Sequence, residues 1–412
     1  MRIGIVTTWL ERGASYVSRQ YKELLENKHD VFIYARGGEG YAIGDSNWDN
    51  QSVTWGKKIP LGVPMSIDLA DFKKWILDNK IETIFFNEQQ WWPPVLLANQ
   101  LGIKTGAYVD YYTKETVQLF ANYDFLICNT KRHLSVFSWH KGTKYIPWGT
   151  NINLFKPQHL EPVENDVVTF FHSCGVSPER KGTDLLIQAF NRIKDSAKLV
   201  IHTQTSIKKH YIDLSDIIDN LTNSGRLTIV EKTVSAPGLY HLGDIYVYPS
   251  RLEGIGLTLS EALSCGLPLI TSDNPPMNEF VSTDSGKVVK INHMHDREDG
   301  YYWLQCEVDI IDLVQKMQFY IDNINDLSNF KKSAREYAKQ NLDWNKNEVD
   351  ILDVFKNVKK LSVEEKKEAK ESAIEYEKKR STLRAKLYSF LPFLFKPFSW
   401  FWFLIKRRYI TH

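Results

Sequence analysis

Two glutamates separated by seven residues are the side chains of this sequence best suited to binding a sugar. Glu253 precedes the glycines Gly254 and Gly256, and Glu261 follows them. Carboxylate oxygens accept hydrogen bonds from sugar hydroxyls, and glycine lets the backbone approach a ligand closely. A loop glutamate followed by a helix glutamate is also a common arrangement without function, so the spacing alone leaves that alternative open.

The elements around the two glutamates predict where they lie. Residues 244–249 form an apolar and aromatic run typical of a buried strand. Residues 258–265 have helical spacing and stop at Gly266. A helix N-terminus presents unpaired N–H groups to anions, and open α/β sheets bind ligands at the carboxyl ends of their strands. The arrangement suggests a ligand with a phosphate and a sugar together. The amides that would contact it belong to Gly256, Leu257 and Thr258.

Two adjacent cations mark a second candidate site. Arg180 and Lys181 stand between a predicted strand at residues 167–172 and a predicted helix at residues 184–193. Cations before a helix N-terminus suit a diphosphate. The P-loop motif Gly-x-x-x-x-Gly-Lys-Ser/Thr is absent, because Gly182 follows the lysine instead of preceding it. Two solvated charges in a turn are the alternative.

No metal or cofactor is expected. The eleven histidines show no His-x-x-x-His pairing, and the acids show no Asp-x-Asp cluster that would hold a metal diphosphate. The four cysteines are far apart without Cys-x-x-Cys spacing, which favours a reduced, cytosolic compartment. The first residues are expected to form a strand rather than a signal peptide, and a net charge of +2 gives no general argument for nucleic acid as a partner.

Strands and helices alternate along both halves of the chain. This order predicts an α/β fold with doubly wound, largely parallel sheets, and 412 residues make two domains the default. Strands of the first half are expected at residues 3–7, 31–35, 81–87, 106–111 and 125–129. Those of the second half are expected at residues 167–172, 198–203, 227–231, 244–248, 268–272 and 286–291, with the rest to Leu361 helical.

Two strand ends of the first half carry side chains that suit an acceptor. Residues 88–94 are polar and aromatic, and aromatic rings stack on sugar CH faces while amides bond hydroxyls. Tryptophans that simply pack in a loop are an equal alternative. Asp110 lies at the carboxyl end of the next strand.

Residues 145–290 resemble the retaining glycosyltransferases of family four, also called glycosyl transferases group 1. The family's motifs occur in order: a hinge at residues 146–157, a phosphate loop and helix at 175–190, the Glu-x7-Glu element at 244–262, and Gly266–Ile270. The resemblance implies the GT-B fold, in which two Rossmann-like doubly wound domains face each other across a cleft. The expected divisions are an acceptor domain at 1–157, a donor domain at 158–345, a helix packing back toward the first domain at 346–361, and a charged and aromatic tail at 362–412.

The resemblance also implies roles. Glu261 would hold the ribose of a nucleotide sugar, Glu253 would contact the donor sugar, and Lys181 would neutralise the diphosphate leaving group. The Gly13 loop would approach the diphosphate from the first domain, and Asp110 stands where the family often has histidine. The chain has Val176 where the family often has arginine, with Arg180 as the candidate substitute, and Ile255 where phenylalanine is usual.

The function implied is metal-independent sugar transfer with retention, from a nucleotide-diphosphate sugar to a glycan or lipid-linked acceptor, as in bacterial polysaccharide or glycolipid synthesis. No nucleophile is evident, and the family suggests front-face transfer in which the departing phosphate oxygen takes the acceptor proton. Two alternatives are a catalytically silent GT-B subunit that binds a partner glycosyltransferase, and a sugar-nucleotide epimerase.

The C-terminal tail predicts a membrane surface as partner. Residues 362–412 contain twelve Lys/Arg and six Asp/Glu, and residues 363–386 are expected to form a solvated helix. Residues 387–408 combine an aromatic run with flanking cations, while prolines interrupt it, which favours an anchor in the membrane plane. A helix docked on the protein and a true span are the alternatives. The expected location is therefore cytoplasmic, peripheral on the inner face of the cell membrane.

Overall fold

The computed structural model describes residues 1–36, 40–57, 59, 63–158, 167–194 and 197–381. The chain forms two compact units. Unit 1 comprises Met1–Cys128, His133–Tyr145 and Glu348–His412, and unit 2 comprises Asn129–Arg132 and Ile146–Asn347. The predicted domain limits at residues 157 and 345 stay predictions, and residues 159–166 of the expected linker lie outside the described residues.

Unit 1 is built on a parallel sheet with the strand order β3-β2-β1-β4-β5-β6-β7. The strands are β1 (Arg2–Thr7), β2 (Asp30–Ala35), β3 (Val53–Trp55), β4 (Thr83–Asn87), β5 (Lys104–Tyr108), β6 (Phe125–Cys128) and β7 (Thr143–Tyr145). Every residue of β4 and β6 is buried, as expected for parallel strands covered on both faces. The predicted strands of the first half are therefore present, each within a few residues of its expected limits.

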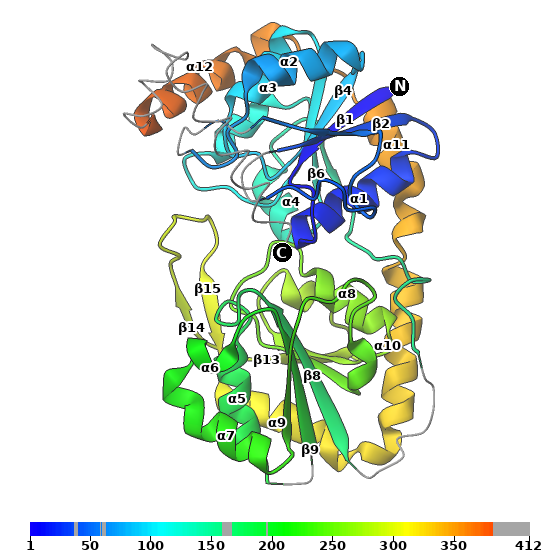
Figure 1. Ribbon diagram of the computed structural model, residues 1–412, viewed down its shortest axis with the longest axis vertical. Helices are drawn as coiled ribbons and strands as arrows, with labels where there is room; N and C mark the ends of the chain where they lie inside the picture. Colours follow the sequence, from blue (N-terminus) through cyan, green and yellow to red (C-terminus); the bar gives the residue numbers. More distant parts are fainter. Residues whose placement is uncertain (37–39, 58, 60–62, 159–166, 195–196, 382–412) are drawn as a thin grey trace. The chain divides into compact units, whose positions relative to one another are not determined.

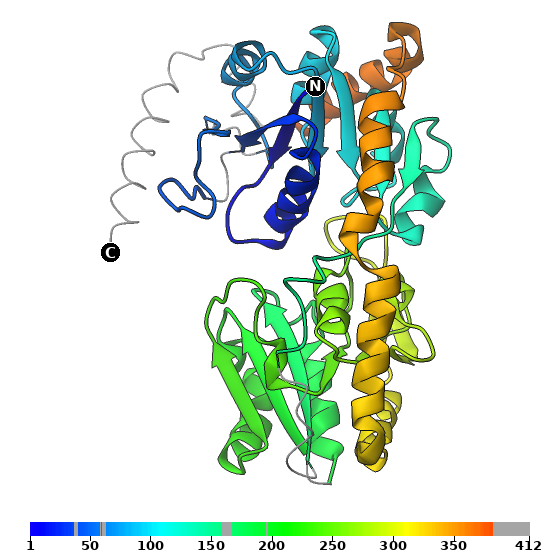
Figure 2. The same ribbon diagram turned by 90° about the vertical axis from the view of Figure 1, so that its right-hand side faces the viewer.

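Helices of unit 1 cover this sheet. They are α1 (Gly13–Leu25), α2 (Leu69–Asp78), α3 (Pro93–Gln100) and α11 (Glu348–Asn357), together with α4 (Lys131–Phe137), whose first two residues belong to unit 2. The α1 helix packs along β1 (Figure 2). The Asp68 side chain caps α2 by accepting hydrogen bonds from the amides of Ala70 and Asp71. The α3 helix starts at Pro93, within the polar and aromatic strand end at 88–94 for which no helix was predicted, and proline suits the first turn of a helix.

The charged helix α12 (Val363–Arg380) docks on unit 1 instead of standing in solvent. Lys366 is only 7% exposed and pairs with the fully buried Asp124 at 2.7 Å. The side chain of Asn122 donates a hydrogen bond to the carbonyl of Ala369 at 2.9 Å. The prediction of a solvated helix was therefore wrong for the face that bears Lys366 and Ala369. The lysine can be buried there because a carboxylate pairs with it.

Unit 2 is built on a second parallel sheet, with the order β10-β9-β8-β11-β12-β13. Its strands are β8 (Val168–Gly175), β9 (Ala197–Thr203), β10 (Leu227–Glu231), β11 (Ile245–Tyr248), β12 (Leu269–Ser272) and β13 (Gly286–Val289). The helices α5 (Thr183–Arg192), α7 (Ser215–Asn223) and α9 (Ile310–Asp322) cover one face, while α8 (Leu257–Ser264) and α10 (Leu327–Asn341) cover the other (Figure 1). Alternation along β11 places Val247 in the core under the first group of helices, and Tyr246 and Tyr248 on the opposite side.

An antiparallel hairpin follows the sheet of unit 2. It consists of β14 (Ile291–His295) and β15 (Gln305–Val308), where a continuous helical region was predicted. That prediction was wrong here. The strands of the hairpin pair between Ile291 and Val308 and between His295 and Gln305. Cys306 also donates its backbone N–H to the carbonyl of Arg251 at 2.9 Å, which holds β15 beside the loop that bears Glu253.

The chain enters and leaves unit 2 at adjacent points. Thr150 exchanges backbone hydrogen bonds of 2.8 and 3.1 Å with Leu342 and Trp344. The rings of Trp148 and Trp344 pack with their centroids 4.8 Å apart. A side chain at Gly149 would place its Cβ 2.6 Å from the carbonyl oxygen of Leu342, so glycine permits this close approach.

All four cysteines are buried and free of disulfide bonds. Among the described residues, no helix is both long and apolar enough to cross a bilayer. The predicted membrane-associating segment, residues 387–408, lies outside the described part of the chain.

Candidate functional site

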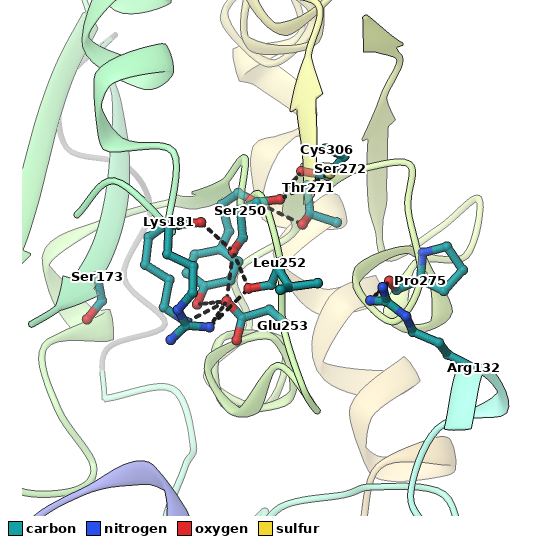
Figure 3. Close-up of polar contacts among 12 residues, drawn as sticks. Arg132, Ser173, Lys181, Ser250, Leu252, Glu253, Thr271, Ser272, Pro275 and Cys306 are labelled. Carbon is teal, nitrogen blue, oxygen red and sulfur yellow. Dashed lines mark hydrogen bonds and ion pairs between the residues drawn. The ribbon is translucent and has the colours of Figure 1, made fainter. Parts of the chain in front are cut away.

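The cations and the first glutamate of the predicted site meet at the carboxyl edge of the sheet in unit 2. Lys181 Nζ lies 2.5 Å from Glu253 Oε1, and Arg180 Nη1 lies 3.3 Å from the same oxygen. Glu253 follows β11, while Arg180 and Lys181 precede α5. Figure 3 shows Lys181, Ser250 and Glu253 turned toward one another. The structure thus brings together residues 72 positions apart in the sequence.

Two further side chains complete this cluster. The hydroxyls of Ser250 and Tyr248 donate to Glu253 Oε1 at 2.7 and 3.0 Å. Lys181 Nζ also lies 5.0 Å from the centre of the Tyr248 ring, close enough for a cation–π interaction. Neither residue was among the predicted site residues. The signal was available, since Tyr248 and Ser250 stand at the carboxyl end of a predicted strand, where ligand sites form.

The protonation of the cluster follows from its burial and charges. Burial would raise the pKa of Glu253, but the charges of Lys181 and Arg180 outweigh it and lower that pKa to about 2. Burial, together with the charge of Arg180, lowers the pKa of Lys181 to about 8. At neutral pH the cluster therefore holds an ionised carboxylate between two cations, a net positive site that suits an anionic ligand.

The loops that carry the cluster fit tightly together. Gly182 has a φ of 68°, in the left-handed region that favours glycine, and forms the N-terminal boundary of α5. A Cβ at this position would lie 2.0 Å from the carbonyl oxygen of Pro249. Glycine therefore lets the loop before α5 rest on the end of β11, which brings Lys181 to Glu253.

The N-terminus of α8 lies directly after this cluster. Gly256 is the N-cap residue of the helix, with a φ of 90°, and as glycine it has no side chain to cap it. Leu257 and Thr258 form its first turn. The first amides of a helix have no intrahelical acceptor and favour an anion, so the predicted amide cradle has the backbone geometry that suits a phosphate.

The second glutamate is held by a tyrosine. The hydroxyl of Tyr240 donates to Glu261 Oε2 at 2.5 Å, and Tyr240 itself is 5% exposed. Glu261 is half-buried on α8. Burial raises its pKa to about 7, while the bond from Tyr240 acts in the opposite direction. The carboxyl of Glu261 is therefore held by Tyr240 through one oxygen and is about half ionised at neutral pH.

The predicted site residues of the first half belong to unit 1. Gly13 is the first residue of α1, where a loop was expected. The buried Asn87 fixes this turn, because its amide donates to the carbonyl of Ala14 at 2.7 Å and to the hydroxyl of Ser18 at 2.5 Å. Asp110 follows β5 and is half-buried. Asn87 was not among the predicted site residues, although it ends a predicted strand.

The aromatic residues at 88–94 mainly pack. Trp92 is 2% exposed and its ring lies 5.5 Å from that of Phe120 and 5.8 Å from that of Tyr123. Trp91 is 8% exposed. Trp92 therefore fills the core, as in the second of the two alternatives, and its ring offers no exposed face on which a sugar could stack.

Among the described residues, no group of three or more His, Cys, Asp or Glu side chains has the arrangement of a metal site. Metal independence stays a prediction. The groups present at the carboxyl edge of unit 2 that can bind a diphosphate are the two cations and the amides at the start of α8.

Residues 155–337 match the family model described as glycosyl transferases group 1. The resemblance inferred from the sequence is thereby confirmed for this part of the chain. The lipopolysaccharide core biosynthesis mannosyltransferase LpsB of Rhizobium meliloti is 28% identical over 151 residues, covering 34% of this chain and 41% of the relative. The chain spans about half the length of the first curated relatives it matches.

Solved structures share the fold over most of the chain. The sucrose-phosphate synthase of Thermosynechococcus elongatus has a TM-score of 0.65 at 17% identity, and covers 86% of this chain and 98% of its own. HepE of Anabaena, solved in complex with UDP-glucose, has a TM-score of 0.62 at 17% identity, with 86% and 99% covered. The expected fold class, α/β with two Rossmann-like domains of the GT-B type, is confirmed.

Proposed function

Because residues 155–337 match the family model of the glycosyl transferases group 1, we propose that this protein is a glycosyltransferase. It moves a sugar from a nucleoside diphosphate sugar to a glycan or lipid-linked acceptor, with retention and without a metal ion. The relative that acts as a lipopolysaccharide mannosyltransferase supports an acceptor of the bacterial polysaccharide or glycolipid class. The donor class is supported by the UDP-glucose complex of HepE, which shares this fold.

The observation that carries the proposal is the cluster of Lys181, Arg180 and Glu253. A departing nucleoside diphosphate develops negative charge, and preorganised cations stabilise that charge in the transition state. Lys181 is 13% exposed at its side chain and is already held in place by Glu253, so little reorganisation is needed. In the proposed complex the diphosphate lies between Lys181, Arg180 and the first amides of α8.

The other residues have supporting roles in this proposal. Glu261 accepts a hydrogen bond from a ribose hydroxyl, with Tyr240 fixing the carboxylate. Glu253 stays ionised, since its pKa lies far below neutral pH, and it faces the donor sugar near the anomeric carbon. The acceptor hydroxyl attacks the anomeric carbon, the bond to the diphosphate breaks, and the departing phosphate oxygen takes the hydroxyl proton.

The donor site is tested by thermal-shift binding. The full chain is titrated with ADP, CDP, GDP, UDP and dTDP, and then with sugar conjugates of the best ligand, each without and with EDTA. We expect one nucleoside diphosphate to raise the unfolding temperature, because a ligand that binds only the folded state stabilises it. The shift is expected to be the same in EDTA.

The outcomes separate the competing functions. Loss of the shift in EDTA would contradict metal independence. Absence of a shift with every nucleotide would contradict the donor site and favour a silent subunit that binds a partner glycosyltransferase. Conversion of the donor to its epimer in the absence of any acceptor would identify a sugar-nucleotide epimerase instead.

We also propose that residues 387–408 attach the protein to the inner face of the cell membrane. The support is the sequence of this segment, in which aromatic residues are flanked by Lys406, Arg407 and Arg408. Aromatic side chains favour the membrane interface, and each cation near anionic lipid adds about 1 kcal/mol. A peripheral location fits an enzyme whose acceptor is lipid-linked.

Deletion of residues 387–412 is expected to move the protein from the membrane fraction to the soluble fraction of a cell lysate. Flotation of the purified full chain with vesicles containing anionic phospholipid gives the same comparison without other proteins. A deletion variant that still floats with the vesicles would show that the tail is not the anchor.

A further inference from the structure

Arg251 lies in the loop that bears Glu253, and its side chain contacts the loop that carries Lys181. Its side chain is 8% exposed, and its guanidinium donates to both carboxylate oxygens of Asp184 at 2.8 and 2.7 Å. It also donates to the carbonyl of Glu179 at 2.5 Å. Asp184 lies in the first turn of α5 and Glu179 in the loop before it, so one side chain holds both ends of the segment that carries Lys181.

The backbone of Arg251 makes the same connection from the other side. Its N–H donates to the carbonyl of Arg180 at 2.8 Å. Two positions further along the chain stands Glu253, the ion-pair partner of Lys181. The loop that carries the cations and the loop that carries the carboxylate are therefore hydrogen-bonded to each other at Arg251, two positions before Glu253.

Arg251 also reaches the hairpin. Its Nε lies 3.3 Å from Glu307 on β15, whose side chain is 38% exposed, and its carbonyl accepts the N–H of Cys306. The contact with Glu307 is longer and more solvated than the paired bonds to Asp184. The Asp184 bridge is therefore the stronger of the two, because paired bonds from arginine to a carboxylate add both energy and a fixed geometry.

We propose that Arg251 is the positioning residue of the donor site, because it fixes the loop that carries Lys181 against the loop that carries Glu253. The assignment of these loops to a donor rests on the proposed function, whereas the bridge itself does not. A guanidinium fork matches a carboxylate at two points and an ammonium does not, so lysine is a poor substitute here.

The first measurement needs no ligand. The pKa of Lys181 is followed by NMR of lysine side-chain nitrogens in the wild-type chain and in Arg251→Lys, with Lys181→Ala to assign the signal. The charged and titratable groups that face Lys181 are Arg180, Glu253, His172, Cys174 and Tyr248. Burial is the largest cause of the low pKa. We therefore expect the pKa of Lys181 to rise from about 8 by at least one in Arg251→Lys, as the loop opens to solvent.

The second measurement is calorimetric binding of the nucleoside diphosphate that stabilises the wild-type chain most in the thermal-shift series. We expect Arg251→Lys to weaken it at least tenfold. Asp184→Asn removes the same bridge from its other end and is expected to have the same two effects. It also serves if Arg251→Lys does not fold. Glu307→Gln is the matched control, with an expected change below twofold.

An unchanged pKa of Lys181 in a folded Arg251→Lys or Asp184→Asn variant would overturn the inference, whatever the wild-type chain binds. Equal weakening by Glu307→Gln would overturn it too, because the hairpin rather than the Asp184 bridge would then hold the loops. A wild-type chain that binds no nucleotide, but whose Lys181 shifts as expected, would overturn the proposed function and leave the positioning role in place.

Discussion

Replacing Lys181 by alanine is expected to lower the rate of sugar transfer by about 10²–10³-fold, the usual effect of losing one preorganised group that stabilises transition-state charge. Two properties of the site make the effect large. Lys181 lies 2.5 Å from Glu253, and removing it leaves this buried carboxylate with the more distant Arg180, at 3.3 Å, as its remaining cation among the described residues. The measurement is kcat and KM with the donor selected by thermal shift.

The matched control for this variant is Lys194→Ala. Lys194 is exposed just after α5 in the same unit, so its loss tests the effect of removing one positive charge. Near-normal turnover by folded Lys181→Ala would contradict the proposed role.

The pH dependence of the wild-type enzyme gives a further prediction. The pH profile of kcat/KM reports the pKa values of groups in the free enzyme. We expect kcat/KM to fall as pH rises through about 8, where Lys181 loses its proton.

Replacing Glu261 by glutamine is expected to stabilise the ligand-free protein while weakening nucleotide binding. Folding raises the pKa of Glu261 from 4.5 to about 7, so the folded state favours the protonated form. The free energy of unfolding therefore falls as pH rises through this range, by about 3 kcal/mol in all. Glutamine cannot ionise, and the variant avoids this cost.

The test of this prediction compares urea unfolding of the two proteins at pH 8 and at pH 4. The variant is expected to be more stable by about 3 kcal/mol at pH 8 and equal to the wild type near pH 4, where both side chains are neutral. Nucleotide affinity is expected to fall about tenfold, since a hydrogen bond to an ionised acceptor is stronger than one to a neutral acceptor. If the variant and the wild-type protein had the same free energy of unfolding at both pH values, the raised pKa of Glu261 in the folded state would be contradicted.

The sequence predicted the parts of the site that local pattern encodes. Glu253 and Glu261 could be placed in a loop and on a helix because a strand and a helix with clear limits flank them. The ion pair of Lys181 with Glu253 was not predicted, since the resemblance implied only separate roles toward the donor for the two residues. The spacing of the cations before α5 carries no information about a carboxylate that the sheet brings beside them.

Other features depend on tertiary contacts between distant residues. Arg251 reads as an ordinary loop cation, because its partner Asp184 lies 67 positions earlier. The hairpin at β14 and β15 was missed because its strands are only five and four residues long, and β15 (Gln305–Val308) alternates over too short a run to stand out from the helical residues that follow. Lys366 was predicted to be solvated, since a lysine among lysines and glutamates gives no sign of the buried Asp124 that it meets.

The adjacent entry and exit of the chain at Thr150 and Asp343 make unit 2 an insertion within unit 1 in the topological sense. Nearly all of its residues form one continuous stretch, Ile146–Asn347, whose two ends are paired with each other. A segment closed in this way can be transplanted or recombined as a module, because joining its ends elsewhere requires little rearrangement. Lys181, Glu253, Glu261 and Arg251 all lie within this stretch, so the whole proposed donor site would be exchanged in one recombination event.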